Sequence, residues 1–346
     1  MSFNKVSFEG SLGKNVVDAG RCVGCGACVV VCPFNCLGYV NAKPKLMREC
    51  KVCGICPQVC PQNEWLQSKA ETFMFGRQRK PDEAFGVYRR LTVAKAKDDS
   101  VLKVCQDGGV VTALLLFALE NGVVDCAVVS GISKDKPLYP VPMLATTSKE
   151  ILESAGTRYF YSPNILALAE ATKQKRAKIA FVGTPCQIRA IRKIQMAGLK
   201  KYATSLKLLV GLMCSECFTY EGLAEKLIHQ KLGINPKDIK KVNIKGKVLI
   251  TTKSDVKGVS LAEAKQYARE NCRFCEDFSS ELADISVGGL GLEGWSFVVV
   301  RTENGEAFFE MAEKAGVLET QPVEEGEPAL NLLIKLSTKK RSLASK

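Results

Sequence analysis

The sequence predicts a chain of two unlike parts, a small cysteine-rich α+β module followed by a larger α/β domain. Nine of the sixteen cysteines lie within the first 60 residues, whereas from Leu91 onward strand patterns alternate with helix patterns. The length of 346 residues is about twice that of a typical domain. We therefore expect a cysteine module over residues 1–66, a linker over 67–90, the α/β domain over 91–330 and a mobile basic tail over 331–346.

The composition excludes several classes of protein. A hydrophobic share of 46% and a charged share of 25% are those of a folded chain rather than a disordered one. Because the sequence has a single histidine, His229, multi-histidine metal sites are excluded, and a Ser-His-Asp relay could use only that residue. We expect it on the surface of an amphipathic helix.

The chain carries no sequence signal for crossing or passing through a membrane. Its longest apolar run, residues 110–119, is well short of the roughly 20 residues that a bilayer span needs. The N-terminus also lacks an apolar signal region. We therefore expect a cytoplasmic chain without a membrane span, free or bound peripherally to the cytoplasmic face of a membrane. In that compartment clustered cysteines are metal ligands rather than disulfides.

The cysteine module contains an internal duplication. A first run with the spacing C-x2-C-x2-C-x3-C and a following proline recurs 28 positions later. In such runs three thiolates converge on one iron–sulfur cluster, and the fourth reaches the other cluster. We assign cluster one to Cys22, Cys25, Cys28 and Cys60, and cluster two to Cys50, Cys53, Cys56 and Cys32. The alternative is a pair of structural zinc sites. Cys36 is left over and is interpreted as a buried bystander.

This module resembles bacterial two-cluster ferredoxins over about residues 15 to 65. The resemblance implies two [4Fe-4S] clusters that carry single electrons.

The remaining pattern predicts an α/β domain after a polar, partly helical linker. Strands are predicted over 91–97, 124–130, 178–182 and 206–213, and helices over 110–121, 165–174, 187–196 and 220–231. Further along we expect a hairpin over 242–252 and a helix over 262–270. A strand pair, 297–302 and 307–311, is expected to turn at Asn304-Gly305.

Two glycine loops precede predicted helices. The first runs from Gln106 and Asp107 through Gly108 and Gly109 to Val110 and Thr112, and the second contains Thr184 and Cys186. Glycines let a backbone approach a phosphate, and a helix N-terminus offers free N–H groups. The first loop lacks the GxGxxG fingerprint, and an ordinary turn is the alternative interpretation.

Residues 171–215 contain no acidic residue, which biases this tract toward a polyanionic ligand. A solvated helix face is the alternative. Nucleic acid is not expected, because no nucleic-acid module accompanies the tract. Its ten basic residues are Lys173, Lys175, Arg176, Lys178, Arg189, Arg192, Lys193, Lys200, Lys201 and Lys207.

A second group of cysteines lies in the α/β part. Cys214 and Cys217 form one CxxC pair, Cys272 and Cys275 form another, and Cys186 makes five candidates for a four-ligand site. Such pairs also suit zinc, but a third cluster would connect the first two to a redox cofactor. Cys105 and Cys126 are interpreted as core residues.

Five ordered segments over about residues 85 to 300 resemble the beta subunits of coenzyme F420-reducing hydrogenases and dehydrogenases. They are VCQDGGVVTALLLFALENGVVDCAVV, AGTRYFYSPN, AKIAFVGTPCQIRAIRK, NIKGK and CRFCEDFSSELADISVGG. With a complete two-cluster module in front, the chain is most similar to the electron-input components of the archaeal F420H2 dehydrogenases. The resemblance implies FAD, a third [4Fe-4S] cluster near it, and oxidation of reduced F420. It also implies, as partner, a membrane-bound dehydrogenase complex with a quinone or phenazine acceptor, or a ferredoxin.

The resemblance also implies roles for particular residues. Gln106, Asp107, Gly108, Gly109, Val110 and Thr112 would hold FAD, and Arg158, Asn164 and Thr184 would line the flavin. Cys186, Cys214, Cys272 and Cys275 would hold the third cluster, with Cys217 competing with Cys186 for one position. Arg189, Arg192, Lys245 and Lys247 would contact F420 or the FAD pyrophosphate, although a plain hairpin turn also accounts for the two lysines. No side chain is expected to act as an acid or base, because the flavin carries the hydride chemistry.

Three other functions stay open at this point. The chain could be a non-catalytic iron–sulfur protein of a larger complex, the beta subunit of a formate dehydrogenase or of an F420-reducing hydrogenase, or the flavin half of a sulfite reductase.

Overall fold

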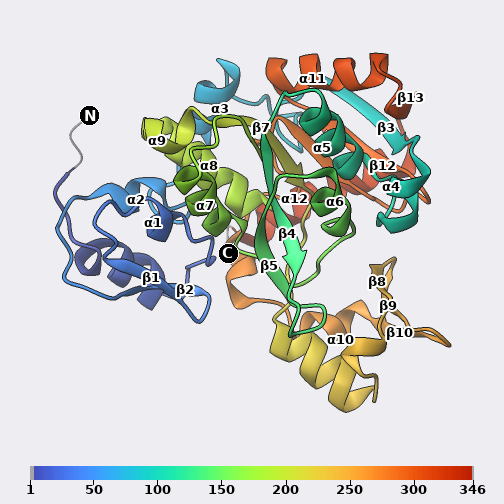
Figure 1. The fold of residues 1–346 in the computed structure, drawn as a ribbon, viewed down its shortest axis with the longest axis horizontal. Helices are drawn as coiled ribbons and strands as arrows, with labels where there is room; N and C mark the ends of the chain where they lie inside the picture. Colours follow the sequence, from blue (N-terminus) through green and yellow to red (C-terminus); the bar gives the residue numbers. More distant parts are fainter. Residues whose placement is uncertain (1–3, 345–346) are drawn as a thin grey trace.

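The computed structural model describes residues 4–344. Figure 1 shows an N-terminal module at one end, a central sheet with helices on both faces, and a small sheet at the opposite end.

The N-terminal module is a small α+β unit with its own core. It contains η1 (Glu9–Asp18), α1 (Ala27–Val30), β1 (Leu37–Val40), β2 (Lys43–Leu46) and α2 (Ile55–Val59). The strands β1 and β2 pair antiparallel. Phe8, Leu12 and Val16 from the N-terminal segment pack on the cysteine loops. The following linker contains α3 (Gln67–Phe75), which agrees with the partly helical linker predicted for this segment.

The central sheet has eight strands in the order β13-β3-β12-β11-β7-β6-β4-β5. Four neighbours, β4, β6, β7 and β11, run parallel, whereas β5, β12 and β13 pair antiparallel with their neighbours. The sheet is therefore mixed, and the predicted α/β alternation is confirmed for its parallel centre. The bounds are β3 (Arg90–Ala96), β4 (Cys126–Ile132), β5 (Pro140–Ala145), β6 (Ile179–Gly183), β7 (Leu206–Leu212), β11 (Ile285–Gly288), β12 (Ser296–Val300) and β13 (Leu318–Pro322).

Helices bury apolar side chains on both faces of this sheet. One face is covered by α4 (Asp99–Val104), α5 (Val110–Glu120), α6 (Ser148–Glu153) and α11 (Glu303–Lys314). The other is covered by η2 (Asn164–Leu166), α7 (Ala167–Lys173), α8 (Pro185–Met196) and α9 (Lys200–Ala203). This second core also contains Val23, Cys25 and Ala27 of the N-terminal module, so the module and the sheet share one apolar interior.

The third unit is a three-stranded antiparallel sheet of β8 (Lys241–Ile244), β9 (Lys247–Thr251) and β10 (Val256–Ser260). It packs with η3 (Tyr220–Lys231), η4 (Pro236–Asp238) and α10 (Leu261–Lys265), and η5 (Glu270–Phe274) follows. The predicted hairpin over 242–252 is confirmed. His229 is exposed on η3, as predicted.

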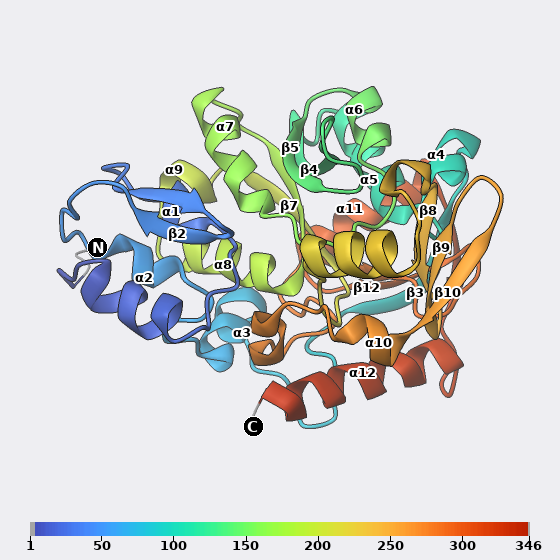
Figure 2. The same cartoon turned by 90° about the horizontal axis from the view of Figure 1, so that it is seen from below.

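Two predictions of secondary structure are wrong. Residues 307–311 are not a strand, because Thr302 accepts a hydrogen bond from the Gly305 amide and starts α11, which buries Phe308 and Phe309 on the sheet. The basic segment is not a mobile tail either, since α12 (Pro328–Ala344) packs Ala329 and Leu333 beside the sheet (Figure 2). Lys346 of that segment lies outside the described residues.

Of the helices in residues 4–344, none has both the length and the apolar character that a membrane crossing requires.

Candidate redox site

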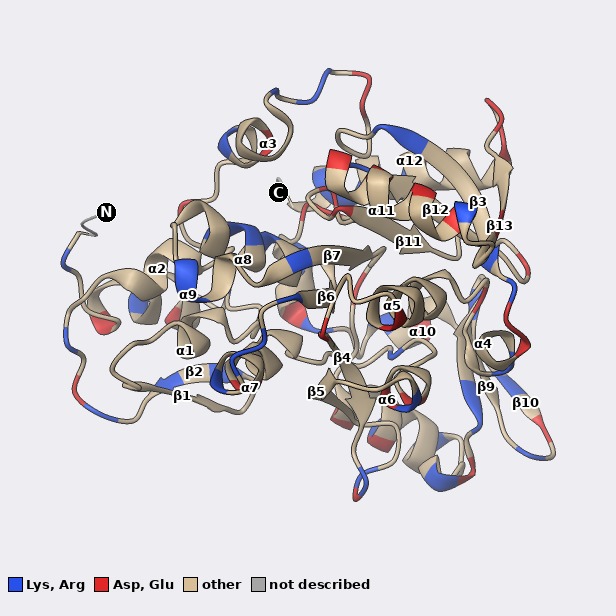
Figure 3. Ribbon diagram, turned by 45° about the horizontal axis from the view of Figure 1, so that its top comes forward, with Lys and Arg blue, Asp and Glu red and all other residues tan. Residues whose placement is uncertain are grey.

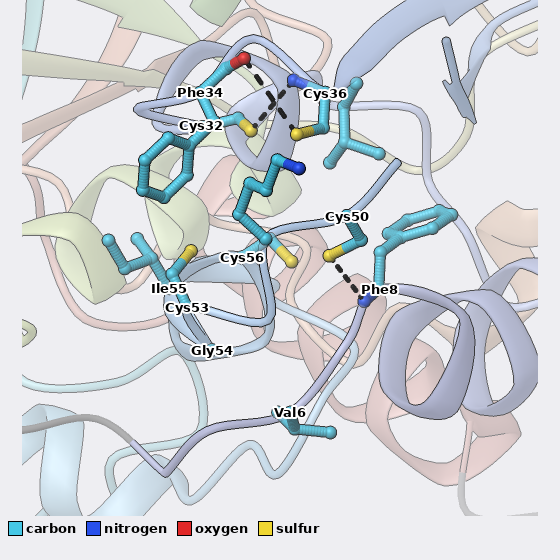
Figure 4. A pocket seen from close by; sticks show the side chains of 12 residues that line it. Val6, Phe8, Cys32, Phe34, Cys36, Cys50, Cys53, Gly54, Ile55 and Cys56 are labelled. Carbon is cyan, nitrogen blue, oxygen red and sulfur yellow. Dashed lines mark hydrogen bonds between the residues drawn. The ribbon is translucent and has the colours of Figure 1, made fainter. Parts of the chain in front are cut away.

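The second cysteine run encloses a small apolar cavity at the outer end of the N-terminal module. Cys50, Cys53 and Cys56 line it together with Cys32 from the first run (Figure 4). The structure therefore brings together the four cysteines predicted to share cluster two. The backbone amides of Phe8 and Cys36 donate hydrogen bonds to the sulfurs of Cys50 and Cys32, each at 3.3 Å. Amide donors and an apolar wall are the surroundings that stabilise iron-bound thiolates.

The cysteines of the first run lie closer to the central sheet than those of the second run. The thiols of Cys25 and Cys28 are each close enough to Cys22 and Cys60 to interact electrostatically with them. Burial raises the pKa of Cys25 and of Cys28 well above the ordinary value, and it raises the pKa of Cys60 to about 11. Burial disfavours the thiolate form of these side chains, and a bound metal cluster would favour it.

The third group of cysteines lies at the carboxyl edge of the central sheet, where ligands bind in open α/β sheets. Cys186 follows β6, and Cys214 and Cys217 follow β7, while η5 brings Cys272 and Cys275 to them. The sulfurs of Cys214 and Cys217 are 3.9 Å apart, and the Cys217 amide donates to the Cys272 sulfur at 3.5 Å. All five candidates therefore meet.

Electrostatics distinguish the thiols of this third group. A hydrogen bond from Cys217 lowers the pKa of Cys214 to about 7, whereas burial raises the pKa of Cys186 to about 12. Lys340 of α12 donates to the carbonyl oxygens of Cys214 and Ser215, both at 2.6 Å. Burial would lower the pKa of Lys340, but the neighbouring thiolates raise it above its ordinary value.

The three groups form one series. Cys28 of the first group lies near Cys56 of the outer group, and Cys25 lies near Cys186 of the third group. Arg269 lies between the first and third cysteine groups. Its guanidinium is 3.9 Å from the centre of the Tyr161 ring and donates a hydrogen bond to the Val23 carbonyl at 3.1 Å.

The first glycine loop lies at the same carboxyl edge, beside the ends of β3 and β11. The Gly108 amide donates to the Ser296 hydroxyl at 3.2 Å, and a side chain at Gly108 would collide with the backbones of Ala94 and Ser296. Gly108 therefore serves close packing, and its amide is not free for a phosphate. Gly109 has φ +73° and starts α5 without a capping side chain, so the amides of this first turn remain available.

The small sheet closes over this loop. The Gln106 side-chain amide donates to the Val242 carbonyl at 3.3 Å, and Lys241 donates to the Gln106 carbonyl at 3.2 Å. Burial raises the pKa of Asp107, and the charges of Lys241 and Lys245 oppose that rise. Lys245 stands 3.7 Å from Glu293, whereas Lys247 is exposed at the start of β9.

Three buried side-chain atoms in the segments beside this loop and the third cysteine group have no hydrogen-bond partner. They are Arg158 Nε, Asn243 Oδ1 and the Tyr161 hydroxyl. The Tyr159–Tyr161 segment runs beside Phe218, just after Cys217, and Tyr159 accepts a hydrogen bond from the Ile244 amide. Buried polar atoms are usually hydrogen-bonded, so these three are candidates for contact with a bound polar group.

Other predicted flavin contacts are used within the protein. Arg158 Nη1 donates to the carbonyl oxygens of Ala155 and Gly156, and Arg158 Nη2 donates to the carbonyl oxygen of Glu153. The Asn164 amide donates to the Val182 carbonyl at 2.9 Å and its oxygen accepts from Ser162. The Thr184 hydroxyl lies 3.3 Å from the Cys186 sulfur, which places it at the third group. Val110 and Thr112 are buried in the first turn of α5.

The structure places Arg189 and Arg192, which were predicted to contact an anionic coenzyme, against side chains of the protein itself. Both are buried: Arg192 pairs with Asp284 at 2.8 Å, and Arg189 lies between Trp65 and the carboxylates of Glu276 and Asp277. Lys193 donates to the carbonyl oxygens of Cys60 and Asn63 instead. The acid-free tract is therefore not a single anion-binding surface.

Sequence reasoning missed Arg269, Tyr161 and Lys340. Arg269 had one available signal, its position three residues before Cys272. Lys340 had none, because only the packing of α12 brings it to the third group.

Comparison with known proteins agrees with this geometry. Two family models match most of the α/β part: residues 91–169 match the N-terminal part and residues 176–326 the C-terminal part of the coenzyme F420 hydrogenase/dehydrogenase beta subunit. Residues 15–38 match a 4Fe-4S binding domain.

Individual relatives cover different shares of the chain. The beta subunit of the coenzyme F420 hydrogenase of Methanothermobacter thermautotrophicus is 42% identical over 266 residues, which are 75% of this chain and 94% of that protein. A component of the F(420)H(2) dehydrogenase of Methanosarcina mazei is 32% identical over 336 residues, 94% of this chain and 91% of that protein. A chain in the structure of the F420-reducing [NiFe] hydrogenase complex from Methanosarcina barkeri superimposes with a TM-score of 0.73 at 37% identity, covering 77% of this chain and 93% of that one.

Proposed function

The chain belongs to the family of coenzyme F420 hydrogenase/dehydrogenase beta subunits, and we propose that it oxidises reduced F420 and passes single electrons outward through three iron–sulfur clusters. The single observation that carries the proposal is the series of cysteine groups. It leads from the carboxyl edge of the sheet, past Cys186 and Cys25, to the outer cavity at Cys32.

FAD belongs at the carboxyl edge, between the Gly109 turn and the small sheet. When bound, FAD accepts a hydride and releases electrons one at a time. The uncapped amides at the start of α5 would hold the phosphates of FAD. Arg158 Nε and Asn243 Oδ1, which have no hydrogen-bond partner in the protein, would form hydrogen bonds with FAD. Lys241, Lys245 and Lys247 of the small sheet place positive charge beside this proposed FAD site, which suits the phosphate and glutamyl tail of F420.

One observation favours the dehydrogenase type over the hydrogenase type. Similarity to the F(420)H(2) dehydrogenase component extends over 336 residues, whereas similarity to the hydrogenase beta subunit covers 266. The longer match spans the two cysteine runs as well as the α/β part. We therefore propose that the electrons leave for a membrane-bound dehydrogenase complex or a ferredoxin.

Anaerobic titration with reduced F420 tests the function directly. The reconstituted chain should lose its flavin absorbance and then its cluster absorbance as reduced F420 is added. A chain that carries flavin but keeps its full absorbance would contradict the proposal. Iron near twelve atoms per chain is expected, from about four per cluster.

The fourth ligand of the third cluster is assigned to Cys186, with Cys217 as the competitor. Cys186→Ser should lower the iron content by about four atoms per chain, whereas Cys217→Ser should keep it. The reverse result would assign Cys217.

A further inference from the structure

The outer cluster cavity opens beside a patch of exposed apolar side chains with a basic rim. The apolar members are Phe34, Met47 and Val52, which are 50%, 60% and 42% exposed. The rim consists of the exposed Lys45, Arg48 and Lys51. We call these six residues the outer patch. Figure 3 shows basic segments along the hairpin of β1 and β2 that carries part of it.

The members of the outer patch are held together by short contacts. The Met47 amide donates to the Cys36 carbonyl at 2.8 Å, and the Cys36 thiol donates to the Glu49 carbonyl at 3.2 Å. Phe34 and Lys51 both line the cavity of Cys32 and Cys53. The two segments 33–36 and 47–52 therefore form one surface directly over the outer cysteines.

We propose that the outer patch is the docking surface for an acidic protein that carries a one-electron centre. The proposal rests on the function proposed above and specifies where the electrons leave. An apolar centre with a polar rim is the anatomy of a protein–protein interface.

Charge decides which kind of partner fits. Residues 33–52 contain four basic residues and one acidic residue, Glu49, which is already paired with Lys51 at 2.8 Å. A positive rim attracts a negative surface and raises the rate of encounter. Position decides that the partner is a redox protein, since the patch covers the cysteine group furthest along the series from the α/β domain.

The test uses the full reconstituted chain and an acidic bacterial two-cluster ferredoxin as acceptor. The double variant Met47→Glu/Arg48→Glu reverses the patch without touching the cavity lining. The rate constant for ferredoxin reduction at low salt should fall about 10- to 100-fold, and its dependence on ionic strength should flatten. The rate with benzyl viologen, a small acceptor that needs no docking, should stay unchanged.

Lys149→Glu is the matched control, since it reverses an exposed charge on α6 of the α/β domain. It should leave the ferredoxin rate unchanged. An equal loss with both variants, or no loss with either, would overturn the proposal. If the double variant loses iron, Lys45→Glu on the same hairpin takes its place and must slow ferredoxin alone.

Two further measurements distinguish this proposal from a failure of the F420 reaction and from binding of the outer patch to a membrane. Clusters reduced with dithionite instead of reduced F420 should show the same ferredoxin defect, so failure of the F420 reaction leaves the docking test intact. Sedimentation with vesicles of anionic phospholipid tests a membrane as the occupant. If the double variant no longer sediments with the vesicles but still reduces ferredoxin at the normal rate, the proposal is overturned in favour of a membrane.

Discussion

The two cysteine runs have the same spacing but occupy different surroundings, and this contrast shows how a duplication acquires two roles. The first run is built into the core that the module shares with α7 and α8, and Arg269 contacts its loop. The second run lies outward, where Phe34 and Val52 are exposed. Under the proposed function, equal ligands would provide an inner relay in one place and an outlet in the other.

Equivalent positions in the two loops show the contrast at single residues. Gly24 has φ +67°, and a side chain there would collide with the Ala42 carbonyl and approach Arg269. Val52, 28 positions later, has φ +51° and is exposed. The inner loop requires glycine because the turn between β1 and β2 packs against it, whereas the outer loop accommodates a strained valine.

The largest effect is expected from removing one ligand of each run. Cys25→Ser should remove about four iron atoms, unfold part of the shared core and stop electron flow to every external acceptor. Cys53→Ser should also remove about four irons, yet it should leave the melting temperature higher than in the Cys25 variant. Iron analysis and thermal denaturation measure both. Equal melting temperatures would contradict the distinction between an embedded run and an outer run.

Gly24→Val should cost about 3–5 kcal/mol of unfolding free energy, because the added side chain meets backbone rather than a movable side chain. Denaturant unfolding measures it. Gly76→Val is the control, because it has a similar positive φ but open space around it, and should cost less.

Arg269→Gln removes a buried cation between the first and third cysteine groups. It should cost about 2–3 kcal/mol, since the Val23 carbonyl loses its donor and Tyr161 loses its cation. The reduction potentials of the two adjacent clusters should shift to more negative values, which redox titration followed by EPR measures. The exposed Arg273, changed to Gln, should alter neither quantity.

Lys340→Met tests the clamp that α12 places on the third group. The carbonyl oxygens of Cys214 and Ser215 lose their charged donor, so unfolding free energy should fall by about 1–3 kcal/mol. Lys335→Met, on an exposed part of the same helix, should change stability within about 0.5 kcal/mol. If α12 were a mobile tail, both variants would behave alike.

The smallest effect is a gain. Val52→Gly should stabilise the chain by about 1 kcal/mol, since it relieves a left-handed valine, less the entropy that glycine loses. Thermal denaturation measures the gain, and a loss would show that the exposed valine makes contacts that outweigh its strain.

Local pattern allowed much of this molecule to be predicted. The cysteine spacing predicted which thiols group, and the structure brings both sets together. The alternation of strands and helices predicted the parallel centre of the sheet, because side-chain periodicity follows the backbone geometry of each element. Asn304-Gly305 misled, since a cap from Thr302 competes with a hairpin turn and the burial of Phe308 decides between them.

What the sequence by itself determined is the ligand inventory and its local spacing, because thiolates within one loop converge without help from the rest of the chain. The tertiary structure decided the surroundings. It buried Arg189 and Arg192 in ion pairs, brought Arg269 and Lys340 to the third group of cysteines, and turned the second run outward. These outcomes depend on contacts between residues far apart in the chain, such as Arg269 with Val23, and no local pattern encodes them.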